Sequence, residues 1–138
     1  MENARRRLIW HGVFLFLLGL VTGLVGEHFT NPRMGLSAHL EGVLNGILLV
    51  ALGSVWQEVH LSSRLGAAAF WLTLFGAYAN WCVTTLAAVF GTGSVTPIAA
   101  VGRSAQPWQE VLVSVGFLGV ALSIMAAAVL ILLGLRSE

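Results

Sequence analysis

Four long apolar runs, at residues 8–25, 36–56, 65–90 and 109–135, constrain the fold of this chain more than any other feature. A helix needs about 20 mostly apolar residues to cross the hydrocarbon core of a bilayer, and each run is of that order. Only 9% of the 138 residues are charged, whereas soluble domains carry roughly 25%. The sequence therefore predicts one all-α membrane domain over residues 1–138, a bundle of four transmembrane helices.

The arginines predict how this bundle sits in the membrane, because cytoplasmic loops carry an excess of positive charge. Most of the arginines fall on one side of the expected bundle: Arg5, Arg6, Arg7, Arg64 and Arg136. Only Arg33 and Arg103 fall on the other side. We therefore expect both termini in the cytoplasm. The net charge of +1 leaves no basic patch large enough for nucleic acid, so the lipid bilayer is the expected surrounding and no nucleic-acid partner is expected.

Polar residues interrupt the second apolar run within two helical turns: His39, Glu41 and Asn45. A charge at the membrane centre costs on the order of 2.5–3.5 kcal/mol, so intramembrane polar groups usually mark binding or catalysis. At about 1.5 Å per residue, Asn45 and Asn80 lie at similar depth on antiparallel helices, with Thr84 one turn above Asn80. We expect one pocket open to the outer leaflet, with His39 near its mouth and the amides at its floor.

Gly42 and Gly46 share a helical stripe with His39 and predict a flat recess beside the imidazole. A planar ligand such as a porphyrin could lie there, with its iron on the His39 nitrogen. No second histidine stands at matching depth on another helix, so a bis-histidine electron-transfer haem is disfavoured. The same residues also permit a bland interpretation. His39 could bond a neighbouring helix, Asn45 and Asn80 could bond each other, and the glycines could only pack.

Three segments carry a resemblance to a known family: RRLIWHGVFLFLLGLVTGL, NPRMGLSAHLEGVLNGILLVALGSVW and FGAYANWCVTTLAAVFGTG. They closely resemble the hydroxylaminobenzene mutases, small four-span proteins of bacterial nitroarene degradation, and the likeness covers residues 6–135. The run NPRMGLSAHLEG is its most specific part. The chain is more distantly similar to styrene oxide isomerase. That enzyme shares the pattern His-x5-Asn-Gly, here His39, Asn45 and Gly46, and a His-Gly pair on the first helix, here at His11.

The resemblance implies a multi-pass isomerase of the bacterial inner membrane that converts hydroxylaminobenzene to 2-aminophenol by intramolecular hydroxyl transfer. It also implies a homo-oligomer, because styrene oxide isomerase is a membrane trimer that holds haem b between subunits. Carried over, His39 is the axial ligand of the haem iron, and Gly42 and Gly46 lie beside the cofactor. Asn45 is the amide that steers a small aromatic hydroxylamine.

The remaining candidate residues are carried over less directly. Asn80 matches an asparagine on the third helix of styrene oxide isomerase. Gly76 and Thr84 stand where that enzyme has an acidic residue and a tyrosine, so its epoxide chemistry is not transferred and the role of Thr84 stays open. Glu41 is a candidate to shuttle the ring proton while Trp81 walls the pocket.

Two alternatives to a haem isomerase stay open. The first is a metal-free isomerase, with Glu41 as general acid and the amides as orienting groups. The second is a non-enzymatic membrane subunit or a small transporter. A transporter should show a continuous polar path or repeated broken helices. The fourth apolar run offers only Ser114 and Ser123 in its core, which disfavours such a path.

Overall fold

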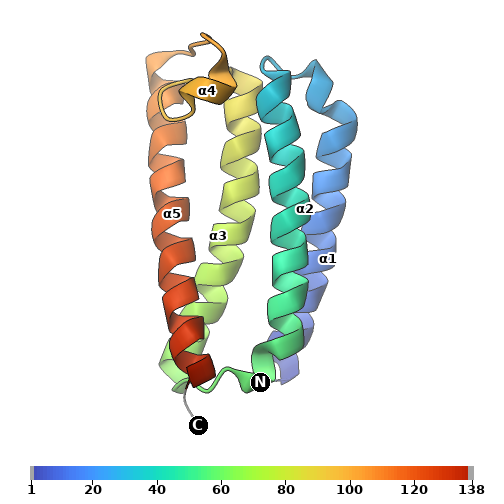
Figure 1. The fold of residues 1–138 in the computed structure, drawn as a ribbon, viewed down its shortest axis with the longest axis vertical. Coiled ribbons are helices and arrows are strands. Elements are labelled where there is room, and N and C mark those ends of the chain that lie inside the picture. The colour runs from blue at the N-terminus through green and yellow to red at the C-terminus, as the bar shows by residue number, and fades with distance from the viewer. Residues whose placement is uncertain (1, 137–138) are drawn as a thin grey trace.

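The computed structural model describes residues 2–136 as a bundle of four long helices (Figure 1). The long helices are α1 (Glu2–Val25), α2 (Pro32–Val55), α3 (Ser63–Phe90) and α5 (Pro107–Arg136). Short helices stand in the connections: η1 (Gly26–His28), η2 (Trp56–Glu58) and α4 (Pro97–Ala100). All four long helices are long and apolar enough to cross a membrane. The predicted four-helix, all-α fold is thereby confirmed.

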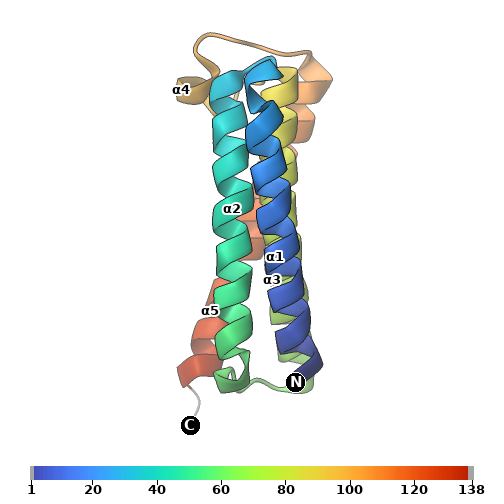
Figure 2. The same cartoon turned by 90° about the vertical axis from the view of Figure 1, so that its right-hand side faces the viewer.

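The long helices contain the predicted apolar runs, except that α2 ends at Val55, one residue before the end of its run. The largest difference is at α1, which begins at Glu2 rather than at residue 8 and so includes the three consecutive arginines. α1 begins and α5 ends at the same end of the bundle (Figure 1). In Figure 2, α1 and α2 form the near layer, and α3 and α5 lie behind them.

Asn31 joins three elements at the opposite end of the bundle. Its side chain accepts hydrogen bonds from the backbone N–H groups of Arg33 at 3.1 Å and Met34 at 3.3 Å, which caps the start of α2. Its amide nitrogen donates to the Ala99 carbonyl at 2.9 Å, and its backbone N–H donates to the Ala88 carbonyl at 2.9 Å. Asn31 therefore fixes the start of α2 against the end of α3 and against α4.

The connection between α3 and α5 is fastened by one carboxylate. α3 ends at Phe90, and the following residue, Gly91, caps it with a φ of 71°, which suits a glycine. Glu110, in the first turn of α5, accepts hydrogen bonds at 3.0 Å from the backbone N–H groups of Gly93, Ser94 and Ala105. The loop is thus held down on α5, over the end of the bundle that also carries α4.

A seam of glycines brings α1 and α2 into backbone contact. A Cβ atom added at Gly19 would lie 2.6 Å from the backbone nitrogen of Val43, and one at Gly42 would lie 2.5 Å from the Gly19 Cα. The same holds farther along, where a Cβ at Gly46 would lie 2.7 Å from the Gly12 carbonyl oxygen. These positions admit no side chain, since the neighbouring atoms belong to the backbone and cannot turn aside.

We predict that Gly19→Ala destabilises the bundle by about 1–3 kcal/mol or more, the usual cost of forcing extra atoms into a packed core. The measurement is thermal unfolding of the detergent-solubilised protein, followed by far-ultraviolet circular dichroism. Gly119→Ala on α5 is the matched control, because an added Cβ there meets nothing within 4 Å. Its midpoint should stay unchanged or rise, since alanine favours helix over glycine. Equal unfolding midpoints for the two variants would contradict the close packing of α1 against α2 at Gly19.

Candidate functional site

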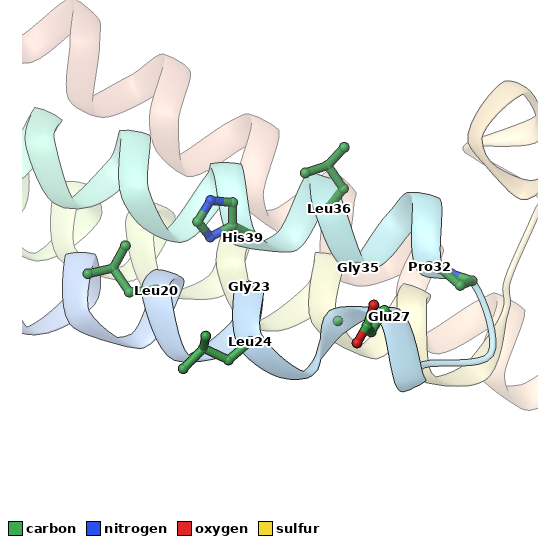
Figure 3. Close-up of a pocket in the computed structure, with 9 residues that line it drawn as sticks. Leu20, Gly23, Leu24, Glu27, Pro32, Gly35, Leu36 and His39 are labelled. Carbon is green, nitrogen blue, oxygen red and sulfur yellow. The ribbon is translucent and has the colours of Figure 1, made fainter.

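His39 lies on α2 and faces α1. Its Nδ1 stands 2.8 Å from the carbonyl oxygen of Gly19. The ring lies over Gly23, where an added Cβ would come within 2.6 Å of Nδ1 (Figure 3). Because a carbonyl oxygen only accepts, Nδ1 carries a proton, and in the neutral imidazole Nε2 is then the nitrogen with the lone pair. The interhelical bond expected of a structural histidine is therefore present, and it also leaves one nitrogen able to bind a metal.

A cavity of about 560 Å³ adjoins this imidazole. Its lining is mostly apolar or glycine: Leu20, Gly23, Leu24, Gly26, Glu27, Pro32, Gly35, Leu36 and His39. Leu24 is 78% exposed and Leu36 60% exposed, so the cavity lies at the membrane-facing surface of the α1–α2 pair (Figure 3). An anchored imidazole with a free Nε2, beside an apolar cavity of this size, fits the ligand and surroundings that a haem iron requires.

Gly42 and Gly46 do not border that cavity. An added Cβ would lie 2.5 Å from the Gly19 Cα at Gly42, and 2.6 Å from the Phe16 nitrogen at Gly46. The backbone of α1 fills the space that the sequence suggested would be a flat recess. The expected recess is therefore absent from the described chain, where the two glycines serve helix packing, and their assignment to a cofactor stays a prediction.

A second polar cluster joins α2 to α3. Oε2 of Glu41 accepts a hydrogen bond from Nδ2 of Asn45 at 3.0 Å and another from Nδ2 of Asn80 at 2.5 Å. Nδ2 of Asn45 also donates to the backbone carbonyl of Glu41 at 2.8 Å. The predicted equal depth of the two asparagines is confirmed, since they meet at one oxygen atom. They do so through the carboxylate and not by bonding each other.

Below this cluster, toward the end where α5 stops, a cavity of about 270 Å³ lies between α2, α3 and α5. Asn45 and Thr73 are its polar residues, and the rest of its lining is apolar: Leu48, Leu52, Ala77, Ile124, Ala127, Ala128, Ile131, Leu132 and Leu135. The hydroxyl of Thr73 donates to the Ala69 carbonyl of its own helix at 2.7 Å. Asn45 therefore offers the free polar function at this cavity.

The imidazole and the carboxylate cluster lie on opposite sides of α2. His39 and Glu41 are two residues apart, which is about 200° around a helix. Accordingly His39 contacts α1, whereas Glu41 contacts α3. The prediction of one pocket with His39 at its mouth and the amides at its floor is therefore wrong within a single chain. The chain has two half-sites separated by the thickness of α2.

The model of the styrene oxide isomerase family matches residues 4–136, nearly the whole chain. The chain belongs to this family. It is 46% identical over 133 residues to hydroxylaminobenzene mutase HabB of Ectopseudomonas oleovorans, an alignment that covers 96% of this chain and 81% of the relative. It is 41% identical over 125 residues to hydroxylaminobenzene mutase HabA of the same organism, with 90% and 93% covered. No solved structure matches. These relationships identify the chain as an isomerase.

Within this isomerase, Gly76 and Thr84 occupy packed positions on α3. An added Cβ at Gly76 would lie 2.7 Å from Cγ1 of Ile124, so α5 fills the space beside this glycine. Thr84 is 3% exposed and lies one turn beyond Asn80. The carboxyl group nearest to Asn80 comes from Glu41 on α2. The acidic function near Asn80 is therefore supplied by α2 rather than by α3.

Trp81 does not wall either cavity, which corrects the prediction made for it. Its indole N–H donates to the hydroxyl of Thr22 on α1 at 3.0 Å, and Thr22 is only 4% exposed. The ring lies against Gly42, where an added Cβ would come within 2.9 Å of its Cδ1. Trp81 therefore fixes the rotation of α3, which turns the adjacent Asn80 toward Glu41.

Sequence reasoning missed a further polar pair between α1 and α3. Nδ1 of His11 stands 3.0 Å from the hydroxyl of Tyr78, which also donates to the His11 carbonyl at 3.3 Å. The rings meet edge to face with centroids 5.7 Å apart. Tyr78 is the only tyrosine in the chain. The sequence did carry a sign of this pair, because a tyrosine hydroxyl within an apolar helix needs a hydrogen-bond partner.

We predict that Thr22→Val lowers the free energy of unfolding by about 1 kcal/mol, because it leaves the Trp81 N–H without an acceptor. Thr85→Val is the matched control, since the Thr85 hydroxyl bonds the Trp81 carbonyl of its own helix and that loss leaves no buried donor unpaired. Denaturant titration in detergent, read from tryptophan fluorescence, measures both. Equal losses of unfolding free energy in the two variants would show that the hydrogen bond between Trp81 and Thr22 does not position α3.

Proposed function

We propose that this chain is a membrane isomerase that converts hydroxylaminobenzene to 2-aminophenol by moving the hydroxyl group from nitrogen to the ortho carbon. The observation that carries the proposal is the Glu41 carboxylate, which accepts hydrogen bonds from Asn45 and Asn80. Of these residues, Asn45 lines an apolar cavity large enough for an arene. The two relatives named hydroxylaminobenzene mutase support the choice of substrate. The substrate is small and apolar enough to reach a site within the bilayer directly.

The hydrogen bonds of the Glu41 carboxylate leave one of its two oxygens available for proton transfer. Net isomerisation moves a hydroxyl group from nitrogen to carbon and a proton from that ring carbon to nitrogen, so nothing is gained or lost. Both amides donate to Oε2 of Glu41, whereas Oε1 accepts no hydrogen bond from the described residues. Oε1 is therefore the atom that takes the ring proton and returns it to the nitrogen. Asn45 and Asn80 hold the carboxyl group, and Asn45 orients the N–OH group.

The proposal includes a haem b held by Nε2 of His39. When bound, this group supplies a Lewis acid that polarises the departing oxygen without net redox change. His39 contributes the ligand, and the carbonyl of Gly19 holds the imidazole in the tautomer that can bind iron. The apolar walls formed by Leu20, Leu24 and Leu36 exclude water from that side.

A homo-oligomer would bring the two half-sites together. His39 and the Glu41 cluster face opposite sides of α2, so a haem on one chain meets an amide cluster only if a second copy supplies it. A trimer is the proposed assembly. We also propose the bacterial inner membrane as the location, with both termini in the cytoplasm, because α1 begins and α5 ends at the end of the bundle that carries most arginines.

We predict that purified wild-type protein shows a Soret band that is lost in His39→Ala. His11→Ala is the matched control, since His11 is also a partly buried membrane histidine but bonds Tyr78, and it should keep the band. Absorption spectra of the three proteins test the assignment. A band unchanged in His39→Ala would remove this residue from the iron.

A metal-free isomerase is the second candidate, and the separation of Glu41 from His39 within one chain favours it. Full activity of wild-type protein without a Soret band would establish that version. In either case the carboxylate carries the proton transfer, so its replacement tests the common part of the two proposals.

We predict that Glu41→Gln lowers kcat about 100-fold or more, the usual contribution of a general acid or base. The glutamine keeps an oxygen that can accept the Asn45 and Asn80 hydrogen bonds, so folding and KM should change little. Glu58→Gln, in η2 at the far end of α2, is the control and should turn over like wild type. The measurement is 2-aminophenol formation by liquid chromatography. Wild-type kcat in Glu41→Gln would exclude Glu41 as the proton carrier.

A further inference from the structure

The cavity between α2, α3 and α5 is apolar along its length and polar at one end. Asn45 stands at that end and is 6% exposed. Its Nδ2 is used twice by Glu41, whereas its Oδ1 accepts no hydrogen bond from residues 2–136. An amide oxygen without a donor, on a side chain that is itself buried, favours a ligand that brings an N–H or O–H group. The lining from Asn45 to Leu52 extends about 10 Å along α2, away from that oxygen.

The volume of the cavity suits one substituted benzene ring. It measures about 270 Å³, and an apolar cavity of roughly 150 Å³ is already enough to bind benzene. The remainder leaves room for a polar head group beside Asn45 and for a substituent at the opposite end of the ring.

α5 supplies the wall that decides how long the ligand can be. α2 and α5 both line the cavity, yet neither packs mainly on the other: α5 packs on α3, and α2 packs on α1 and α3. Figure 1 shows α3 between them. Small side chains create the space on α5, at Ala127 and Ala128. Leu132, which is 67% exposed, stands at the membrane-facing rim. The cavity is therefore open on the side of Leu132.

We infer that this groove binds the aromatic ring of the substrate, with the N–OH group at Asn45 and Glu41, and that Ala128 and Leu132 determine which para substituents are accepted. The para position points away from the nitrogen and so lies toward Leu132. The choice of a hydroxylaminoarene rests on the proposed function. The ring site itself rests on the volume, the apolar lining and the free Oδ1 of Asn45.

The kinetic test uses rim residues, because their substitution disturbs little packing. Ala128→Phe fills the groove and should raise KM for hydroxylaminobenzene about tenfold or more. Leu132→Ala opens it and should raise kcat/KM for 4-butyl-hydroxylaminobenzene, relative to the unsubstituted substrate, about tenfold. The controls lie on the same helix outside the cavity: Ala126→Phe, and Leu122→Ala at a site 64% exposed. If Ala128→Phe has the same KM as Ala126→Phe, and Leu132→Ala has the same substrate preference as Leu122→Ala, the groove is not the ring site.

A binding measurement separates this inference from the proposed reaction. Aniline has the ring and the amine but no N–O bond, so it binds without turnover. It should raise the unfolding temperature of wild type and of Ala126→Phe, and fail to do so for Ala128→Phe. That pattern supports the ring site even if hydroxylaminobenzene is not isomerised, an outcome that would overturn the proposed function alone. Equal stabilisation of both phenylalanine variants would overturn the ring site even in an active isomerase.

Discussion

The backbone contact between α1 and α2 is the interaction on which the rest of this bundle depends. Gly12 and Gly19 on one helix meet Gly46 and Gly42 on the other, with no side chain between them. In a bilayer, apolar surface gives little drive for helices to associate, so close van der Waals contact has to supply it. The same proximity lets Nδ1 of His39 reach the Gly19 carbonyl. Without the seam, the imidazole would have neither its partner nor a fixed tautomer.

The seam also decides what the opposite face of α2 can do. With its glycine stripe turned to α1, α2 presents Glu41 and Asn45 to α3. Trp81 then sets the rotation of α3 by bonding Thr22 on α1. One tight helix pair and one indole hydrogen bond therefore place three polar side chains at a single point between α2 and α3. The cost of placing a half-buried carboxylate there is offset by two amide donors on one of its oxygens.

The sequence was sufficient to predict the four helices and the meeting of Asn45 with Asn80, because apolar length and residue counting measure position along the membrane normal. It was not sufficient for the surroundings of Gly42 and Gly46. Helical periodicity shows that these glycines share the stripe of His39, but it does not say whether a ligand or another helix fills the space. The backbone of α1 fills it. For the same reason the sequence placed His39 and the amides in one pocket, although α2 separates them.

The position of the carboxyl group distinguishes the chemistry open to this chain from that of its epoxide-isomerising relative. At the α3 position where the resemblance expects an acid, this chain has Gly76, and Ile124 of α5 packs into the space. Glu41 supplies a carboxyl group from α2, bonded to the same Asn80. The acid therefore lies beside Asn45, the buried amide that lines the groove. In the proposed reaction a ring carbon loses its proton to nitrogen, and a carboxyl group bonded to both amides can carry that proton.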